Sequence, residues 1–372
     1  MIAKSLRLHQ FKNIPSANCE FSPRLNCFFG NNGMGKTNLL DALYYLSFTK
    51  SHLNINDSLA IQSGTDMTIV GGAYLSDIGN DEEIALSLKS DGARMSKTLK
   101  RNGKSYQAFK EHIGQFPLII ITPQDSQLII GSPEERRRFL DQFLSQRSMD
   151  YMDALMQYKG FLAHRNAALK NGTSDPLTLE YIEAGMAASA SLISRTRREF
   201  IETFAPLFDK YYEAISGGMD NVSLGYDPSI SFDSESDFLD ALNAVREKDR
   251  ILGYTTVGVH RDDISMKLGE ELIRKVGSQG QCKSFLIALK LAQFVHLKEK
   301  TEERPMLLLD DIFDKLDAER MERIINLVSE ENFGQIFVTD TNRKHLDEII
   351  DRKYDDYRLF AVDNGEVMLE KY

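Results

Sequence analysis

The stretch Gly30-Asn31-Asn32-Gly33-Met34-Gly35-Lys36-Thr37 fits the pattern G-x-x-x-x-G-K-[ST] of a phosphate-binding loop. Glycines let such a loop curl so that successive backbone N–H groups point inward around an anion. The lysine then reaches the outer phosphates, and the threonine hydroxyl holds Mg²⁺. An apolar run at 25–29 predicts a buried strand before the loop, and residues 38–46, starting at Asn38, predict a helix after it. Nucleotide binding is therefore the working hypothesis.

Composition sets the limits of that hypothesis. The 372 residues predict one large core with an insertion, or two packed lobes. A net charge of -10 argues against bulk attraction to nucleic acid, so any such site is a local basic patch. Cys19, Cys27 and Cys282 are too scattered for a disulfide framework or zinc cluster and are expected to be reduced. The absence of a long apolar run or a secretory segment predicts a soluble, cytoplasmic protein.

The first third of the chain reads as β-structure. Period-two patterns predict strands over 2–11, 68–75, 83–89 and 96–101. The dipeptide Asn102-Gly103 is a strong signal for a type I′ hairpin. This hairpin carries the cations Lys97, Lys100, Arg101 and Lys104. They are either a solvated edge that blocks aggregation or contacts for nucleic-acid phosphates.

The middle third reads as mostly helical. A buried strand at 117–123 is followed by Gln124, and Ser132-Pro133 begins a helix that carries Arg136, Arg137 and Arg138. Further helices are expected from about 148, and from about 175 to 215 with a kink at Pro206 and an end at Gly217-Gly218.

Strands are then expected at 222–224 and 230–232, with a helix at 236–248. The cluster His260-Arg261-Asp262-Asp263 is placed on a loop between two strands. A local salt-bridged turn is one interpretation of this cluster, and a functional role is the other.

Three later segments carry chemistry. Gly277-Ser278-Gln279-Gly280-Gln281 begins an amphipathic helix, roughly two dozen residues before an apolar strand at 306–311 that ends in Asp310 and Asp311. Because Mg²⁺ on a phosphate loop needs a carboxylate, usually through water, Asp310 is assigned to the metal. Asp311 is placed to orient or deprotonate the attacking water. A further buried strand is expected within 334–342.

Taken together, these motifs resemble the ABC-type family of DNA repair ATPases related to SMC and Rad50. The resemblance extends over nearly the whole chain and rests on Leu8-His9-Gln10-Phe11-Lys12-Asn13, the phosphate loop, Thr122-Pro123-Gln124-Asp125, Gly131-Ser132-Pro133-Glu134-Glu135-Arg136-Arg137-Arg138, Gly258-Val259-His260-Arg261-Asp262-Asp263, the Ser278 turn and Leu308-Leu309-Asp310-Asp311. It implies an α/β fold: an ABC-type ATPase head, a P-loop NTPase with a β-rich N-terminal part. Residues 1–125 and 252–372 would form the ATPase lobe, and 126–251 a mostly helical inserted lobe without a long coiled coil.

The resemblance also implies residue roles. Gln124 would sense Mg²⁺ and the γ-phosphate, and the turn of Ser278, Gly280 and Gln281 would act on ATP bound by a second subunit. Asp317 would be the acid of the D-loop at the dimer seam. Lys12 and Asn13 would lie near the nucleotide.

Three departures from the wider family pattern qualify these roles. Asp311 stands where most members have Glu, which suggests slow turnover. Thr339-Asp340-Thr341 replaces the usual switch histidine, and Asp314 replaces a small residue at the start of the D-loop.

The implied function is an ATP-dependent homodimer that clamps double-stranded DNA near single-strand gaps and opens after weak ATP hydrolysis. RecR and RecO mediators and the RecA recombinase would be its partners, with no membrane involved. Candidate DNA contacts are the four hairpin cations, the three arginines at 136–138, and Arg195, Arg197 and Arg198. The rival interpretations are an ABC transporter subunit, a small-molecule P-loop kinase and a purely structural SMC-like module.

Overall fold

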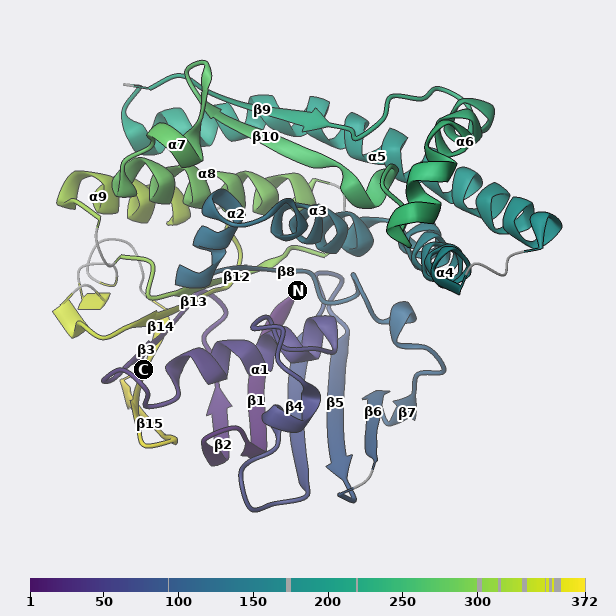
Figure 1. The fold of residues 1–372 in the computed structure, drawn as a ribbon. Coiled ribbons are helices and arrows are strands. Elements are labelled where there is room, and N and C mark those ends of the chain that lie inside the picture. The colour runs from purple at the N-terminus through teal and green to yellow at the C-terminus, as the bar shows by residue number, and fades with distance from the viewer. Residues whose placement is uncertain are drawn as a thin grey trace. The chain divides into compact units, whose positions relative to one another are not determined.

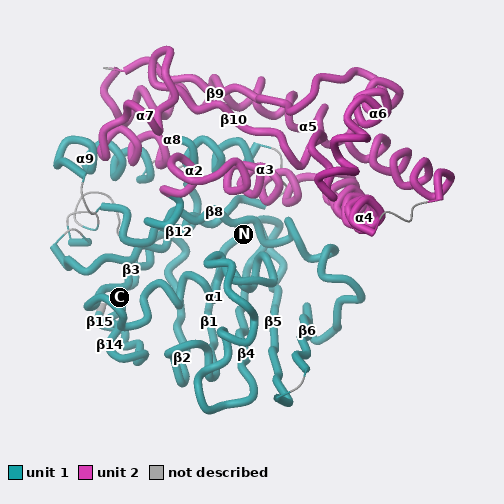
Figure 2. Tube along the Cα trace, viewed as in Figure 1, with its two compact units in different colours: residues 1–125, 289–372 teal, residues 126–288 magenta. Residues whose placement is uncertain are grey.

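The computed structural model describes residues 1–92, 94–171, 175–218, 220–299, 303–313, 316–329, 333–344, 346–347, 350 and 356–371. Two compact units are present (Figure 2): unit 1 comprises Met1–Asp125 and Leu289–Tyr372, and unit 2 comprises Ser126–Ala288. The sequence placed the return to the first unit at 252, whereas the structure keeps 252–288 in unit 2. The reason is that β10 (Asp263–Leu268) pairs along its whole length with β9 (Val222–Asp227).

Unit 1 contains a mainly parallel sheet in the order β15-β14-β3-β13-β12-β8. The strands from β14 to β8 are parallel, and only β15 runs antiparallel. Their bounds are β3 (Leu25–Phe29), β8 (Leu118–Ile121), β12 (Met306–Asp310), β13 (Ile336–Asp340), β14 (Tyr357–Asp363) and β15 (Glu366–Lys371). β8, β12 and β13 are buried throughout, as expected for parallel strands covered on both faces.

The second sheet of unit 1 is antiparallel, in the order β2-β1-β4-β5-β6-β7. Its strands are β1 (Ile2–Phe11), β2 (Ile14–Glu20), β4 (Met67–Leu75), β5 (Asp81–Ser90), β6 (Met95–Arg101) and β7 (Lys104–Ser105). Arg101 pairs with Lys104, and Asn102 and Gly103 have φ of 50° and 78°. Two left-handed residues in a two-residue loop are the geometry of a type I′ turn, so the predicted hairpin is confirmed.

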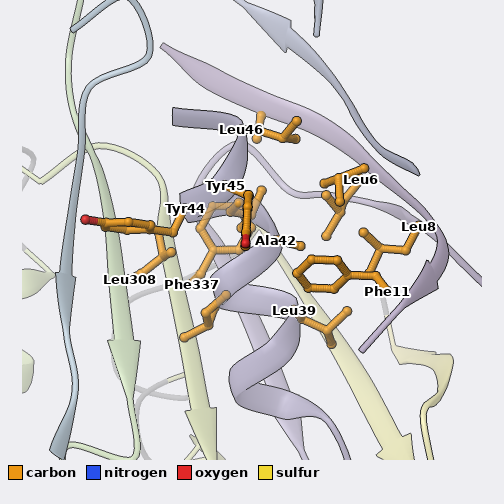
Figure 3. Close-up of a cluster of buried hydrophobic side chains, with 14 of the residues drawn as sticks. Leu6, Leu8, Phe11, Leu39, Ala42, Tyr44, Tyr45, Leu46, Leu308 and Phe337 are labelled. Carbon is orange, nitrogen blue, oxygen red and sulfur yellow. The ribbon is translucent and has the colours of Figure 1, made fainter. Parts of the chain in front are cut away.

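Helix α1 (Lys36–Phe48) lies between these two sheets (Figure 3). Leu6, Leu8 and Phe11 of β1 lie on one side of it, and Leu308 and Phe337 of the parallel sheet lie on the other. Every residue from 39 to 48 is buried, which is the pattern of a helix enclosed on all sides. The Phe11 and Tyr45 rings meet edge to face with centroids 5.7 Å apart. The helix that follows the phosphate loop is therefore fixed by both sheets.

The remaining elements of unit 1 are short. They are η1 (Asp57–Ala60), η2 (Phe109–Glu111), η3 (Pro123–Ser126) and α9 (Ala318–Val328). Helix α8 (Gln279–Lys298) begins in unit 2 and ends in unit 1.

Unit 2 consists of helices and a small antiparallel sheet (Figure 1). Its elements are α2 (Gln127–Ile130), α3 (Pro133–Arg147), α4 (Met149–Asn171), α5 (Pro176–Ser216), α6 (Glu235–Leu252), η4 (Val259–Arg261), β11 (Glu271–Leu272) and α7 (Ile273–Val276), together with β9 and β10. Helix α5 contains Pro206 in its interior and ends at Gly217 with φ 78°, so the predicted long helix and its end are confirmed.

Two predicted strands are absent from the described part of unit 2. Residues 230–232 form a loop, and residues 255–257, which precede the His260 cluster, also lack strand pairing. Near the cluster, backbone N–H groups bond to side chains and not to a neighbouring strand. Thr255 N–H donates to Asn166 Oδ1 at 2.8 Å, and Thr256 N–H donates to Asp249 Oδ1 at 3.0 Å. Of the two strands expected to flank the His260 cluster, β10 therefore forms after it, and residues 255–257 before it do not.

Buried arginines hold the helices of unit 2 together. Arg197 of α5 is 1 % exposed and donates to Asp141 of α3 at 2.8 Å, Tyr151 of α4 at 3.1 Å and Asp262 at 3.1 Å. Arg165 of α4, fully buried, pairs in the same way with Glu183 and Asp249. Such groups are destabilising unless every charge has its partner.

No helix among the described residues is long and apolar enough to cross a membrane.

Replacement of Arg197 by methionine tests the role of this network. Arg197→Met leaves Asp141 and Asp262 without their shared cation, and we expect a loss of about 3 kcal/mol in the free energy of unfolding. Urea denaturation followed by circular dichroism measures it. Arg195→Met, an exposed position on the same helix, is the control and should change stability by less than about 0.5 kcal/mol. Equal urea midpoints for the two variants would contradict the assignment.

Candidate functional site

The candidate site is built at one edge of the parallel sheet of unit 1. The phosphate loop follows β3, Asp311 follows β12, Thr341 follows β13, and Pro123 with Gln124 follows β8. Because these strands are parallel and neighbours in the order β3-β13-β12-β8, their carboxyl ends share one edge. Ligands of open α/β sheets bind at this edge. The fold therefore brings together four of the predicted segments.

The phosphate loop is curled around its own lysine. Lys36 Nζ donates to the carbonyl oxygens of Gly30 at 2.8 Å and Asn31 at 3.1 Å. Gly35 has φ 119°, and a Cβ added there would lie 3.0 Å from Asn13 Oδ1, so both backbone and space require glycine. Asn31, Asn32 and Gly33 are exposed at the crown of the loop. The concave backbone of the loop leads directly into the N-terminus of α1, and the partial positive charge at that helix end favours the binding of an anion.

Thr37 and Asp310, the two residues that the sequence assigns to Mg²⁺, lie in direct contact. Thr37 Oγ1 lies 3.0 Å from Asp310 Oδ1 and 2.9 Å from Oδ2. Asp310 is 4 % exposed. A hydroxyl and a carboxylate at this spacing fit the hard oxygen ligands of Mg²⁺, which is held by few side chains together with water and phosphate oxygens. No cluster of three His, Cys, Asp or Glu suited to a metal occurs among the described residues.

Asp311 directly follows β12 in an unusual backbone conformation. Its φ is 46°, in the left-handed region that residues other than glycine rarely adopt. Its N–H donates to the Thr339 carbonyl at 3.2 Å and to Thr339 Oγ1 at 3.1 Å. Gln124 lies exposed in η3 at the end of β8. The structure thus places both predicted catalytic residues at the same sheet edge as the phosphate loop.

Asn13 and Lys12 differ in what they contact. Asn13 touches the phosphate loop, since its Nδ2 lies 3.4 Å from the Gly33 carbonyl and its Oδ1 accepts from Asn38 Nδ2 at 2.7 Å. Lys12 Nζ instead pairs with Asp41 Oδ2 of α1 at 2.5 Å, in the interior. Lys12 therefore anchors the β1–β2 turn that carries Asn13.

The sequence reasoning missed Asp41. Its carboxylate is fully buried and also accepts from Ser51 Oγ at 2.8 Å and from His52 Nδ1 at 2.7 Å. Burial raises the pKa of Asp41, but hydrogen bonds and charges from His52 and Lys12 outweigh it, so this pKa lies below its ordinary value of 3.8. One acid in the apolar run Leu39-Leu40-Asp41-Ala42-Leu43 was the available signal.

The Ser278 turn lies in unit 2, at the start of α8. Ser278 N–H donates to Gln281 Oε1 at 2.9 Å, and Gln281 N–H donates to Ser278 Oγ at 3.2 Å, which is a reciprocal capping box. Gly280 is half-buried in the first turn, and Ser278 is exposed. The turn is therefore pre-formed, with its hydroxyl at the surface.

Asp317 caps α9 in unit 1. Its Oδ1 accepts from the Arg320 N–H at 2.8 Å, and the side chain is exposed. Asp314, at the start of the predicted D-loop, lies outside the described residues.

The hairpin cations divide into two kinds. Lys97 pairs with Asp57 at 2.9 Å, and Arg101 forms a two-pronged pair with Glu82 at 2.8 Å for each bond. Lys100 and Lys104 are exposed. Lys100 and Lys104 are therefore accessible to phosphates, whereas Lys97 and Arg101 are already paired with acids of unit 1.

The arginines of α3 are bound within unit 2. Arg136 is 3 % exposed and makes two bonds to the Asp263 carboxylate, at 2.6 Å and 2.9 Å. Arg137 donates to the Asp262 carbonyl at 2.7 Å, and Arg138 donates to Glu135 at 2.9 Å. Because α3 packs on β10, Arg136 and Arg137 hold the His260 cluster in place. The cluster is thus cross-linked to distant helices and is not a local salt-bridged turn.

Comparison with known proteins decides the family. A family model described as RecF/RecN/SMC N terminal domain matches residues 2–366. A curated relative from Porphyromonas gingivalis, DNA replication and repair protein RecF, is 48% identical over 99% of this chain and 100% of its own length. The protein of the same name from Parabacteroides distasonis is 50% identical over 99% of both chains. The chain belongs to the RecF family.

Solved RecF structures agree with this membership. A structure of the recombination mediator protein RecF-ATP in the RecFOR pathway has a TM-score of 0.88 at 27% identity, covering 100% of this chain and 98% of that one. Its RecF-ATPrS counterpart has a TM-score of 0.87 at 26% identity, covering 99% and 98%. A Smc head domain from Pyrococcus furiosus, at 16% identity with a TM-score of 0.56 over 99% and 96%, shares the fold. The ABC-type ATPase head predicted from the sequence is confirmed.

The role of Asp41, the buried carboxylate of α1 in this RecF-family chain, can be tested by substitution. Asp41→Asn leaves Lys12 without a counter-charge, and we expect a loss of about 3 kcal/mol in the free energy of unfolding at pH 7. Since the folded pKa of Asp41 is depressed, its contribution is present above pH 3.8 and is lost as the pH falls further. The difference in urea midpoint between wild type and variant should therefore shrink below pH 3.8.

Glu20→Gln, an exposed acid on β2, is the control for this measurement and should lie within about 0.5 kcal/mol of wild type. A constant difference between wild type and Asp41→Asn from pH 7 to pH 3 would show that the carboxylate charge is not what stabilises this region.

Proposed function

We propose that this RecF-family protein is an ATP-dependent DNA-binding protein of recombinational repair. ATP with Mg²⁺ binds at residues 30–38 and Asp310, drives homodimerisation, and closes the dimer on double-stranded DNA at single-strand gaps. Slow hydrolysis then reopens it. The observation that carries the proposal is the direct contact of Thr37 with Asp310 beside a phosphate loop curled around Lys36. Those three side chains supply the anion and metal contacts that a nucleoside triphosphate requires.

Dimerisation is supported by the Ser278 turn. Its capping box uses the Ser278 oxygen as acceptor, so the hydroxyl proton stays available for a phosphate oxygen. The turn also lies at the N-terminal end of the long helix α8, where partial positive charge favours an anion. A γ-phosphate bound by a second subunit is the ligand that this exposed turn suits. Two ATP molecules would then join two subunits.

Hydrolysis would use Asp311 as the base, with Gln124 next to the same edge. Asp is one methylene shorter than the Glu of most ABC-type ATPases, and its backbone is held in a left-handed conformation by Thr339. The reach of its carboxylate toward an attacking water is therefore reduced. Slow turnover follows, which suits a clamp whose closed state has to persist.

DNA and partner binding rest on the relatives and on the charge distribution. RecF structures with ATP are described as recombination mediators of a RecFOR pathway, so RecR, RecO and loading of the RecA recombinase are the proposed partners here. Lys100 and Lys104 are the first candidates for phosphate contacts, which position a protein without reading sequence. With a net charge of -10, the chain depends on such local cations for binding.

The clamp is tested by fluorescence anisotropy of a gapped DNA duplex titrated with protein in ATP, in ADP and without nucleotide. We expect tight binding with ATP alone, and at least tenfold weaker binding for Lys36→Ala because the variant loses its main phosphate contact. Lys4→Ala, the loss of an exposed lysine elsewhere on unit 1, is the control and should bind as wild type does. Equal binding in all three nucleotide states would refute the nucleotide-gated clamp and favour a structural SMC-like role.

The proposed base is tested by two substitutions of Asp311. Asp311→Asn should lower kcat about 10² to 10⁴ fold, since it removes a general base, while ATP-dependent dimerisation in sedimentation velocity is retained. Asp311→Glu should raise kcat if carboxylate reach limits turnover. An unchanged or lower kcat in Asp311→Glu would contradict that explanation of slow hydrolysis.

A further inference from the structure

Thr339 occupies a central place in the parallel sheet. It lies on β13, between β3, which leads into the phosphate loop, and β12, which ends in the acid pair; its backbone partners are Phe28 and Asp310. The residue is fully buried. Its hydroxyl donates to Asp310 Oδ1 at 2.6 Å and accepts from the Asp311 N–H at 3.1 Å. One hydroxyl therefore contacts both members of the acid pair.

We propose that Thr339 is a positioning residue for the acid pair, which holds Asp310 for the metal and Asp311 for the attacking water. The inference rests on the proposed nucleotide function of this site. Thr339 is the first residue of the segment Thr339-Asp340-Thr341, which stands where the wider family has a switch histidine. Its side chain is turned into the sheet, toward the carboxylates, and has no exposed surface with which to meet a phosphate.

The first effect of Thr339 is on Asp310. Asp310 Oδ1 receives the hydroxyls of Thr37 and Thr339, at 3.0 Å and 2.6 Å. Hydrogen bonds from neutral donors to a buried carboxylate are charge-assisted, and together they fix the rotation of the carboxylate about its Cβ–Cγ bond. Without the Thr339 hydroxyl, the carboxylate keeps its Thr37 contact alone and is free to turn away from the metal position. Partners of this kind commonly set metal affinity.

The second effect of Thr339 is on Asp311. Left-handed backbone is unfavourable for aspartate and persists where neighbouring groups enforce it. The Asp311 N–H is shared by the carbonyl and the hydroxyl of Thr339, at 3.2 Å and 3.1 Å. Valine at 339 would keep the carbonyl contact and the β-sheet pairing and would remove only the hydroxyl. The substitution thus isolates the positioning function from the strand itself.

The experiment compares Thr339→Val and Thr339→Ser with a matched control, Thr68→Val. Thr68 of β4 is equally buried, and its hydroxyl donates to the His9 carbonyl at 2.9 Å, far along the chain from the acid pair. Both valine variants lose one buried hydroxyl group, with two hydrogen bonds at Thr339 and one at Thr68, so thermal unfolding of each variant is measured to control for general destabilisation. The readouts are the affinity for a fluorescent ATP analogue in EDTA, the Mg²⁺ concentration for half-maximal enhancement of that binding, and kcat.

For Thr339→Val we expect unchanged affinity in EDTA, about a tenfold higher Mg²⁺ requirement and a lower kcat. Thr339→Ser should restore both to within about twofold, and Thr68→Val should match wild type. A wild-type Mg²⁺ requirement and kcat in Thr339→Val would overturn the inference, as would a serine variant as defective as the valine variant. Should Thr339→Val fail to fold, Thr339→Ala carries the same test, because it removes the hydroxyl without adding a methyl group.

The wild-type protein separates failure of this inference from failure of the proposed function. Wild-type protein that binds the analogue with Mg²⁺ dependence, together with an unaffected Thr339→Val, would overturn the inference alone. Wild-type protein that does not bind the analogue would overturn the nucleotide function and the inference with it.

Discussion

The enclosure of α1 between two sheets is the constraint on which the candidate site depends. A helix that exposes no residue from 39 to 48 cannot shift without disturbing both the antiparallel and the parallel sheet. The phosphate loop is the N-terminal extension of that helix, so its curvature and the direction of Lys36 inherit this rigidity. Asp41 adds a polar contact to this packing, because its ion pair with Lys12 links the helix to the β1–β2 turn that carries Asn13. Because these contacts order the loop before a ligand arrives, binding does not incur the entropic cost of ordering it.

Several arginines of unit 2 have a structural role that cannot be read from the amino-acid composition. Arginine-rich stretches on α3 and α5 suggest a basic surface, yet Arg136, Arg165 and Arg197 are all at most 3 % exposed and paired with acids of other elements. Their acids belong to the His260 cluster and to helices distant in sequence. Opposite charges placed far apart along the chain thus specify which helices and loop pack together, at a desolvation cost that the ion pairs offset in part. The surface available for polyanions is correspondingly smaller than the arginine count implies.

Features encoded within a few neighbouring residues were predictable from the sequence. Glycine or proline positions, or the spacing of apolar residues, are the local signals for four of these features: the phosphate loop, the Asn102-Gly103 hairpin, the long α5 and the strand ending in Asp310. Features that depend on partners far along the chain were not. The strand expected before the His260 cluster does not form, because Thr255 bonds to Asn166, which lies far away along the chain, and Thr256 bonds to Asp249 of α6. The contact of Thr339 with both acids likewise needs the β12–β13 register, which no single segment encodes.

The insertion of unit 2 into unit 1 has a consequence for the order of synthesis. β3 and the phosphate loop leave the ribosome early, but both strands that flank β3 in the sheet, β13 and β14, come more than 300 residues later. At ordinary elongation rates this delay is on the order of half a minute. Throughout it β3 has no partner strand on either side, whereas the sequence of unit 2 is complete once Ala288 has been added, before β13 begins. A nascent chain of this topology therefore offers chaperones a long-lived, strand-shaped hydrophobic target close to its N-terminus.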